Sequence, residues 1–262
     1  MNLLNVIILG IVEGISEFLP ISSTYHLIIT SWIIGVSETE FVKLFQVVIQ
    51  VGAILSVVLL YWKEIISSKS LLAKLIISFI PTGIVGLFFY KVIKNVFFEN
   101  LIASTLVFIT VGIVFVLIEK AIKEEKITIN KKLKELTIWQ AIFIGLFQAC
   151  AIVPGVSRSG AVLIGMLIFG YNRNDSAKYS FMLSIPTISA AALFDLVKSR
   201  EVLMVDQSQY LILLIGAIIA FISAYFGVLW LIKYLQNHSL VIFGWYRIGL
   251  GILLLFGLLT SS

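Results

Sequence analysis

Two carboxylates near the start of the chain could do chemistry that an apolar environment rarely tolerates. Glu13 and Glu17 are four residues apart, so they lie on one face of a helix. Inside a bilayer, each ionised carboxylate costs several kcal/mol unless it has a partner or water. Two of them on one face repel each other, so we expect a divalent cation between them, either Mg²⁺ or Ca²⁺. The alternative is a solvated pair at the membrane surface, against which stands the mostly apolar stretch before Glu13.

Hydroxyl groups and a histidine follow Pro20 closely in the chain. Ser23 and His26 are three residues apart, so a hydroxyl nucleophile and its base could share one helical face. Ser22 and Thr24 are expected to line the same site. The alternative is that one hydroxyl caps the next helix and that His26 is a packed, hydrogen-bonded residue.

A second cluster, Ser157-Arg158-Ser159-Gly160, lies in a turn rich in glycine and serine. The guanidinium of Arg158 has the fork geometry that pairs bidentately with phosphate oxygens. The backbone N–H groups of Ser159 and Gly160, at the start of a helix, would add two donors. An ion pair between Arg158 and a carboxylate of the first cluster is the alternative, and a substrate could later separate such a pair.

Together, these groups indicate phosphoryl transfer, because a cation and an arginine would neutralise charge on the transferring group. With the site inside the membrane, the substrate is expected to be a lipid phosphate. Gln50 and Gln148 are polar residues within apolar segments. They either line this site or form hydrogen bonds between helices.

The elements that position these residues are predicted to be transmembrane helices. The chain of 262 residues is 60% hydrophobic and 13% charged, whereas a soluble domain carries about 25% charged residues. Its mean hydropathy is +1.09. Six apolar runs are long enough to cross a bilayer, namely 41–62, 72–93, 101–119, 179–198, 210–232 and 240–260. We therefore predict a single all-α polytopic membrane domain over residues 1–262.

Two further apolar segments, 3–34 and 139–169, are broken midway by Pro20 and Pro154. A proline disrupts a helix, and such a break is tolerated in a membrane where protein or a wet cavity covers it. Each half-segment is too short to span, so we predict two re-entrant helical hairpins.

The positions of the two breaks also indicate an internal repeat. Pro20 and Pro154 are 134 residues apart, and each is followed by three predicted spans. Three crossings are an odd number, so the second copy enters the membrane inverted, and the site is expected where the broken helices meet. The repeats are expected to cover about 1–122 and 136–262.

Charge in the loops predicts the orientation and accounts for the net charge of +5 without nucleic-acid binding. Lysine and arginine gather in the loops of one side, near 63–74, 120–137, 170–178 and 233–239. The loops of the opposite side hold Glu38, Glu40, Glu99, Glu201 and Asp206. Basic loops face the cytoplasm. We therefore expect a multi-pass protein of the inner or plasma membrane, with both termini outside and a site open to the outer side.

The two clusters resemble the motifs of the undecaprenyl-diphosphate phosphatase family known for bacitracin resistance, and the resemblance covers essentially the whole chain. The matching residues are Glu13-x-x-x-Glu17-Phe18-Leu19-Pro20, Ser22-Ser23-Thr24-x-His26, Phe147-Gln148, Pro154-Gly155-x-Ser157-Arg158-Ser159-Gly160 and Tyr246-Arg247-Ile248. The resemblance implies an inverted-repeat membrane fold and release of phosphate from a polyprenyl diphosphate. The monophosphate product would then carry sugars for cell-wall peptidoglycan synthesis.

The resemblance also implies a role for individual residues. Glu13 and Glu17 match the family's acidic motif. Ser23 matches its proposed nucleophile, His26 its histidine and Arg158 its phosphate-binding arginine.

The chain departs from the family pattern at two positions. Tyr25 stands where the family has glycine, which would narrow the pocket, and Val162 stands where it has threonine, which removes a hydroxyl near the phosphate. A different lipid carrier, such as dolichol, and a homodimer stay open. A lipid flippase or transporter with the same site stays open too, because inverted repeats with broken helices are also a transporter architecture.

Overall fold

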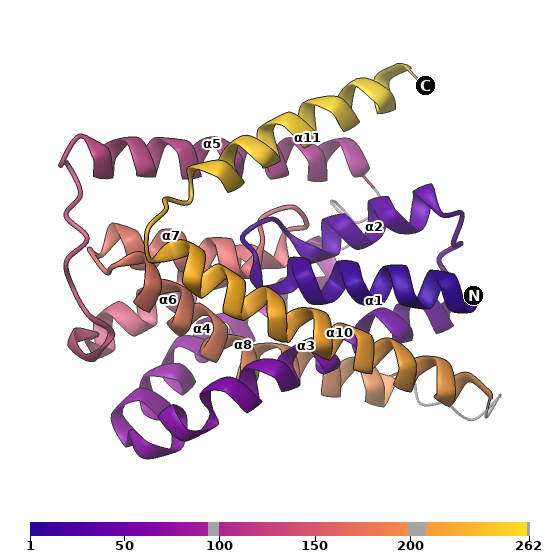
Figure 1. Ribbon diagram of the computed structural model, residues 1–262, viewed down its shortest axis with the longest axis horizontal. Coiled ribbons are helices and arrows are strands. Elements are labelled where there is room, and N and C mark those ends of the chain that lie inside the picture. Colours follow the sequence, from indigo (N-terminus) through magenta and orange to yellow (C-terminus); the bar gives the residue numbers. More distant parts are fainter. Residues whose placement is uncertain (94–99, 199–207, 261–262) are drawn as a thin grey trace.

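The computed structural model describes residues 1–93, 100–198 and 208–260, and helices dominate it (Figure 1). Within these residues, six helices are long and apolar enough to cross a membrane. They are α3 (Glu40–Ser67), α4 (Lys69–Ile93), α5 (Leu101–Lys123), α8 (Arg173–Lys198), α10 (Ser208–Leu235) and α11 (Val241–Thr260). Each overlaps one of the six predicted spans, so the prediction of an all-α polytopic membrane protein is confirmed.

Four shorter helices form the two hairpins that the sequence predicts. The first hairpin consists of α1 (Leu3–Phe18) and α2 (Ser23–Ile33), and the second of α6 (Ile138–Ala149) and α7 (Arg158–Ile168). α1 ends two residues before Pro20, and a 3₁₀ turn, η3 (Cys150–Ile152), lies between α6 and Pro154. A second such turn, η2 (Leu133–Glu135), precedes α6. α1, with 16 residues, is the longest of the four, and a transmembrane helix needs about 20.

In the part of the chain that the structure describes, each half has a hairpin followed by three long helices. This order agrees with a repeat of one hairpin plus three spans. The inverted relation of the halves and the limits of about 1–122 and 136–262 stay predictions. The orientation in the membrane also stays a prediction, and three of the acidic residues that support it, Glu99, Glu201 and Asp206, lie outside the described residues.

Small residues let the helices pack backbone against backbone. α10 lies against α1 and α3, and a Cβ at Gly52 of α3 would lie 2.3 Å from the carbonyl oxygen of Ala217 in α10. In the second hairpin, a Cβ at Gly145 of α6 would lie 2.2 Å from the carbonyl oxygen of Ser78 in α4. Lipid tails are as apolar as leucine, so close contact of this kind is what holds helices together in a membrane.

A buried arginine joins the breaks of the two hairpins. Arg247 of α11 has no exposed surface, and its guanidinium donates to the carbonyl oxygens of Pro20 and Phe108, each at 3.1 Å, and of Gly155. The guanidinium carbon also lies 4.4 Å from the ring centre of Phe108. Broken helices leave carbonyl oxygens unpaired, and hydrocarbon offers them no donor. Arg247 therefore satisfies both breaks and fixes them against each other.

The residue that caps the second helix of each hairpin has an uncommon backbone conformation. Ser22 before α2 has a φ of 68°, and Ser157 before α7 has a φ of 75°. Residues other than glycine rarely adopt a positive φ, and such strain gathers at functional sites. Both serines lie at the breaks, where the sequence predicts the site.

Candidate active site

A cavity of about 760 Å³ opens where the two hairpins meet. Eight of the predicted site residues line it, namely Glu17, Ser22, Ser23, Thr24, Gln50, Gln148, Ser157 and Arg158. The remaining predicted residues do not line it, and they are Glu13, His26, Ser159 and Gly160. The cavity therefore collects residues from both hairpins and from α3.

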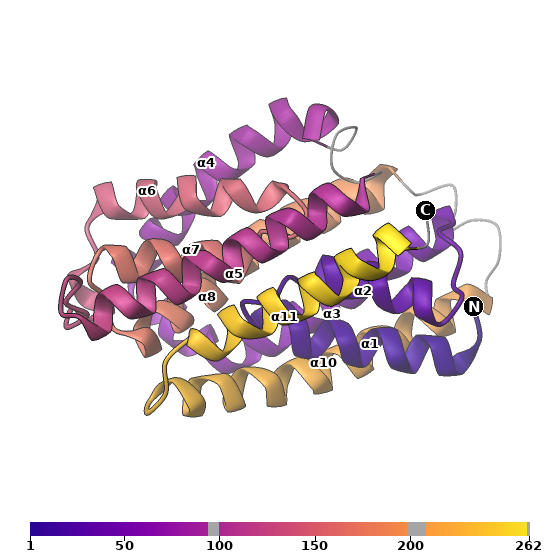
Figure 2. The ribbon, with the colours of Figure 1, turned by 90° about the horizontal axis from the view of Figure 1, so that it is seen from above.

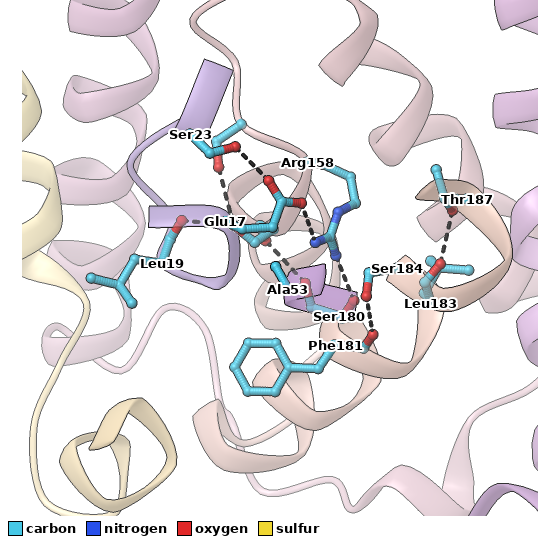
Figure 3. Close-up of polar contacts among 12 residues, drawn as sticks. Glu17, Leu19, Ser23, Ala53, Arg158, Ser180, Phe181, Leu183, Ser184 and Thr187 are labelled. Carbon is cyan, nitrogen blue, oxygen red and sulfur yellow. Dashed lines mark hydrogen bonds and ion pairs between the residues drawn. The ribbon is translucent and has the colours of Figure 1, made fainter. Parts of the chain in front are cut away.

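Glu17 is the centre of a buried polar cluster (Figure 3). The hydroxyl of Ser23 donates to Oε2 of Glu17, and Nη2 of Arg158 lies 3.0 Å from Oε1. Nη1 of Arg158 donates to the carbonyl oxygen of Ser180 in α8 at 2.8 Å. The side chains of Glu17 and Arg158 are 7% and 12% exposed, so the ion pair is buried in the wall of the cavity. The ion pair considered above as the alternative for Arg158 is therefore present.

Arg158 keeps a donor for a ligand despite this pairing. Its Nε atom is buried and has no hydrogen-bond partner among the described residues. A buried donor without a partner costs about 1–3 kcal/mol. A phosphate oxygen would satisfy it with a charge-assisted hydrogen bond. Arg158 therefore keeps one unused donor beside the ion pair.

The neighbours of Arg158 hold the turn in place. Ser159 is fully buried, and its hydroxyl donates to the carbonyl oxygen of Leu19 at 2.9 Å, which links the second hairpin to the first. The N–H of Gly160 donates to Oγ of Ser157 at 3.2 Å and so caps α7. The Gly160 N–H, which was predicted to bind phosphate, therefore already has a protein partner.

His26 does not pair with Ser23. Its Nδ1 lies 2.8 Å from the carbonyl oxygen of Ser22, and its Nε2 lies 2.7 Å from the hydroxyl of Tyr246. A carbonyl oxygen can only accept, so Nδ1 carries the proton and Nε2 accepts from Tyr246. Both ring nitrogens are thus engaged away from Ser23. The group in position to take the Ser23 proton is Glu17, in place of the histidine that the spacing suggested.

Glu13 lies one helical turn before Glu17 and is fully buried. Both of its carboxylate oxygens lack a hydrogen-bond partner among the described residues, and the charges of Glu17 and Arg158 act on it. Two such oxygens beside a second carboxylate fit a hard cation such as Mg²⁺ or Ca²⁺. Within 1–93, 100–198 and 208–260 there is no group of three or more His, Cys, Asp or Glu that could hold a metal ion. Water or substrate oxygens would therefore have to complete the coordination.

Gln148 has both roles that the sequence left open. It lines the cavity and is fully buried. Its Nε2 donates to Oγ1 of Thr82 at 2.8 Å and to Oγ1 of Thr187 at 3.1 Å. These bonds connect α6 to α4 and α8. Gln50 lines the cavity from α3.

The two departures from the family pattern do not change the cavity wall, because neither residue lines it. Tyr25 packs on the ring of Phe108, and its hydroxyl lies 2.6 Å from Oγ1 of Thr105. The tyrosine therefore points toward α5. The expectation that it narrows the cavity is wrong. Val162 is fully buried in an apolar cluster with Tyr179. A hydroxyl at that position would lie in the core.

Four residues at or beside the site had no assigned role in the sequence, namely Thr82, Thr187, Tyr246 and Arg247. The Tyr246-Arg247 pair did carry a signal, since it matches a family motif near the end of the chain. An arginine inside a predicted span is also costly and therefore informative. The two threonines carried no signal, because hydroxyls are common in transmembrane helices.

Known proteins resemble this chain over nearly its whole length. The family described as bacitracin resistance protein BacA matches residues 6–253. A relative from a Sulfurihydrogenibium species is 46% identical over 97% of this chain and 98% of its own length. The relative from Aquifex aeolicus is 44% identical over 94% of both chains, and that from Bdellovibrio bacteriovorus is 40% identical over 100% of this chain and 98% of its own.

All three of these relatives are named undecaprenyl-diphosphatase. The match begins within α1 and ends within α11, so it includes every residue of the candidate site. The resemblance inferred from the motifs is thereby confirmed. This chain belongs to the bacitracin resistance protein BacA family.

Proposed function

We propose that this protein is an undecaprenyl-diphosphatase, an integral membrane phosphatase that hydrolyses undecaprenyl diphosphate to the monophosphate and inorganic phosphate. The cluster of Ser23, Glu17 and Arg158 in the cavity wall carries the proposal, because it joins a nucleophile, a base and a phosphate-binding group. The name shared by the relatives supports the same reaction. The transport alternative draws no support from them, since each is named as a diphosphatase. The product would serve again as the lipid carrier for cell-wall sugars.

Arg158 is the group that we assign to the diphosphate. Within the described part of the chain, its Nε donor lacks an acceptor, and Ser157 also lines the cavity. The incoming phosphate also competes with Glu17 for the guanidinium, because both present paired oxygens to its fork. Binding would thus loosen the ion pair and leave the carboxylate of Glu17 free to accept a proton.

In the chemical step, Oγ of Ser23 attacks the terminal phosphorus while its proton passes to Glu17, the hydrogen-bond partner of that hydroxyl. The bond between this phosphorus and the bridging oxygen breaks, and its electron pair leaves with the polyprenyl monophosphate. Glu17 then gives the serine proton to the leaving monophosphate and is again a carboxylate. Water attacks the phosphoserine while Glu17 takes the proton of the water, and this proton returns to Oγ of Ser23 as inorganic phosphate leaves. In the alternative step, Ser23 orients a water molecule that attacks directly. His26 acts in neither route, because it is held by Ser22 and Tyr246.

Glu13 and Glu17 are the residues whose carboxylates would hold a divalent cation. The orphaned oxygens of Glu13 support this assignment. A bound Mg²⁺ or Ca²⁺ would neutralise part of the negative charge on the diphosphate.

The proposed orientation places the cavity toward the outer side of the inner or plasma membrane. The cavity wall continues along the C-terminal halves of α4 and α8, as far as Phe88 and Asp195. Both helices begin in loops rich in lysine and arginine, and such loops face the cytoplasm. Their C-terminal halves then lead outward. A homodimer stays a prediction.

Arg158→Ala is expected to lower kcat/KM for phosphate release by about a hundredfold or more, because the clamp on the transferring phosphate is lost. Arg173→Ala is the matched control, since Arg173 also pairs with a buried glutamate, Glu119, and does not line the cavity. Phosphate release from undecaprenyl diphosphate by purified protein in detergent measures the difference, with thermal unfolding of both variants beside it. Equal losses of activity in the two variants would contradict a role in phosphate binding.

Ser23→Ala is expected to lower phosphate release by about a hundredfold or more if the serine is the nucleophile. Ser184→Ala should retain activity. Ser184 is also a buried serine, but its hydroxyl donates to the backbone carbonyl of Phe181 and it does not line the cavity. Acid quenching with labelled substrate should trap a phosphoenzyme in the native protein and not in Ser23→Ala. Nearly full activity of Ser23→Ala would exclude the covalent route.

Removal of divalent cations with a chelator is expected to abolish phosphate release, and added Mg²⁺ or Ca²⁺ should restore it. Glu13→Gln should raise the cation concentration for half-maximal activity by about tenfold or more, because one charged ligand is lost. Glu119→Gln, which changes a buried glutamate outside the cavity, should leave that concentration unchanged. Full activity in the presence of chelator would refute the cation site.

A further inference from the structure

One part of the cavity has no role in the chemistry described so far. Beyond the polar end at Glu17 and Arg158, the cavity continues between α4 and α8, where its wall is mostly apolar and where Asp195 is the charged residue among those that line it. This part, called the apolar arm below, is lined from α4 by Phe79, Gly83, Gly86, Leu87 and Phe88, and from α8 by Ile188, Ala190, Ala191 and Phe194.

The apolar arm is formed by one face of each helix. Phe79, Gly83 and Gly86 on α4 are spaced by three or four positions, which is the spacing of a helical face. Ile188, Ala191 and Phe194 on α8 are spaced by three. At roughly 1.5 Å per residue, the face from Phe79 to Gly86 is about 10 Å long. Gly83 and Gly86 have no side chain and Ala190 has only a methyl group, so these residues leave space along the arm. A Cβ at Gly86 would meet nothing within 4 Å.

The far end of the apolar arm is exposed at the side of the helix bundle. Leu87 and Phe88 of α4 are 77% and 75% exposed, and Phe194 of α8 is 56% exposed. Figure 2 shows the C-terminal half of α4 standing out at the edge of the helix bundle. Pro81 lies inside this helix, and a proline interrupts the backbone bonding and permits a kink. On the N-terminal side of Pro81, the hydroxyl of Ser78 donates a 2.6 Å hydrogen bond to the carbonyl oxygen of Ala141 in α6. This bond anchors that part of α4.

We propose that the apolar arm binds the first isoprene units of the substrate, and that the polyprenyl chain leaves the protein between α4 and α8 into the bilayer. This inference rests on the proposed function, because the occupant is the tail of the diphosphate bound at Arg158. A polar end and an apolar arm in one continuous cavity match the two parts of one amphiphilic molecule. A water-soluble diphosphate would gain nothing from an arm that opens to lipid.

Gly86→Trp tests the inference by filling the apolar arm from α4. The matched control is Gly249→Trp on α11, where a Cβ also meets nothing within 4 Å and which lies outside the cavity. Phosphate release is measured with dimethylallyl, farnesyl and undecaprenyl diphosphate, in detergent and in nanodiscs. Gly86→Trp is expected to lower kcat/KM for the undecaprenyl substrate by about tenfold or more relative to the dimethylallyl substrate. This is the size of effect expected when a few methylene groups of the longer tail are no longer buried in the arm. Gly249→Trp should leave this ratio unchanged.

Ala190→Phe narrows the same arm from α8 and should shift the ratio in the same direction, so the test does not depend on one variant folding well. An unchanged ratio in both variants, or an equal loss for all three chain lengths, would overturn the inference. Failure of the native protein to hydrolyse any of the three substrates would instead overturn the proposed function. The two failures are therefore distinguishable.

Discussion

Inside a membrane, every charge and every unpaired backbone group must find its partner in the protein itself. Two helices of this chain are broken by prolines at that depth, and the carbonyl oxygens of Pro20 and Gly155 lie at the breaks. Arg247 binds both of them and shares its charge with a third carbonyl and the ring of Phe108. The breaks therefore have to lie beside each other, and the helices that carry them are placed accordingly.

The contacts that join the two hairpins are also the contacts that build the site. Ser159 donates across to the carbonyl oxygen of Leu19, and Arg158 pairs across with Glu17. The same carboxylate accepts from Ser23. Removing one partner of a buried pair of this kind is costly because it leaves the other charge without a partner. The pairing therefore keeps the reactive cluster stable before substrate arrives. A phosphate would compete for a guanidinium that folding has already placed at the cavity wall.

Spans and breaks were predictable from the sequence because bilayer thickness sets the length of a helix and because proline cannot continue one. The charged residues of the site stood out because charge at that depth is costly. The partner of Ser23 was not predictable, since its spacing to His26 describes one helix alone. The imidazole turns to Tyr246, which is 220 residues away in the chain. The role of Arg247 was hidden for the same reason, because it depends on which carbonyls two distant breaks leave free.

The link between the hairpins through Glu17 and Arg158 is tested most directly by a double-mutant cycle on the free energy of unfolding in detergent. Glu17→Gln and Arg158→Gln are each expected to cost about 3–5 kcal/mol, because each leaves a buried charge unpaired. The double variant is expected to cost less than the sum of the two by about 1–3 kcal/mol. Costs that add to within about 0.5 kcal/mol would contradict a direct link between the two hairpins at the site.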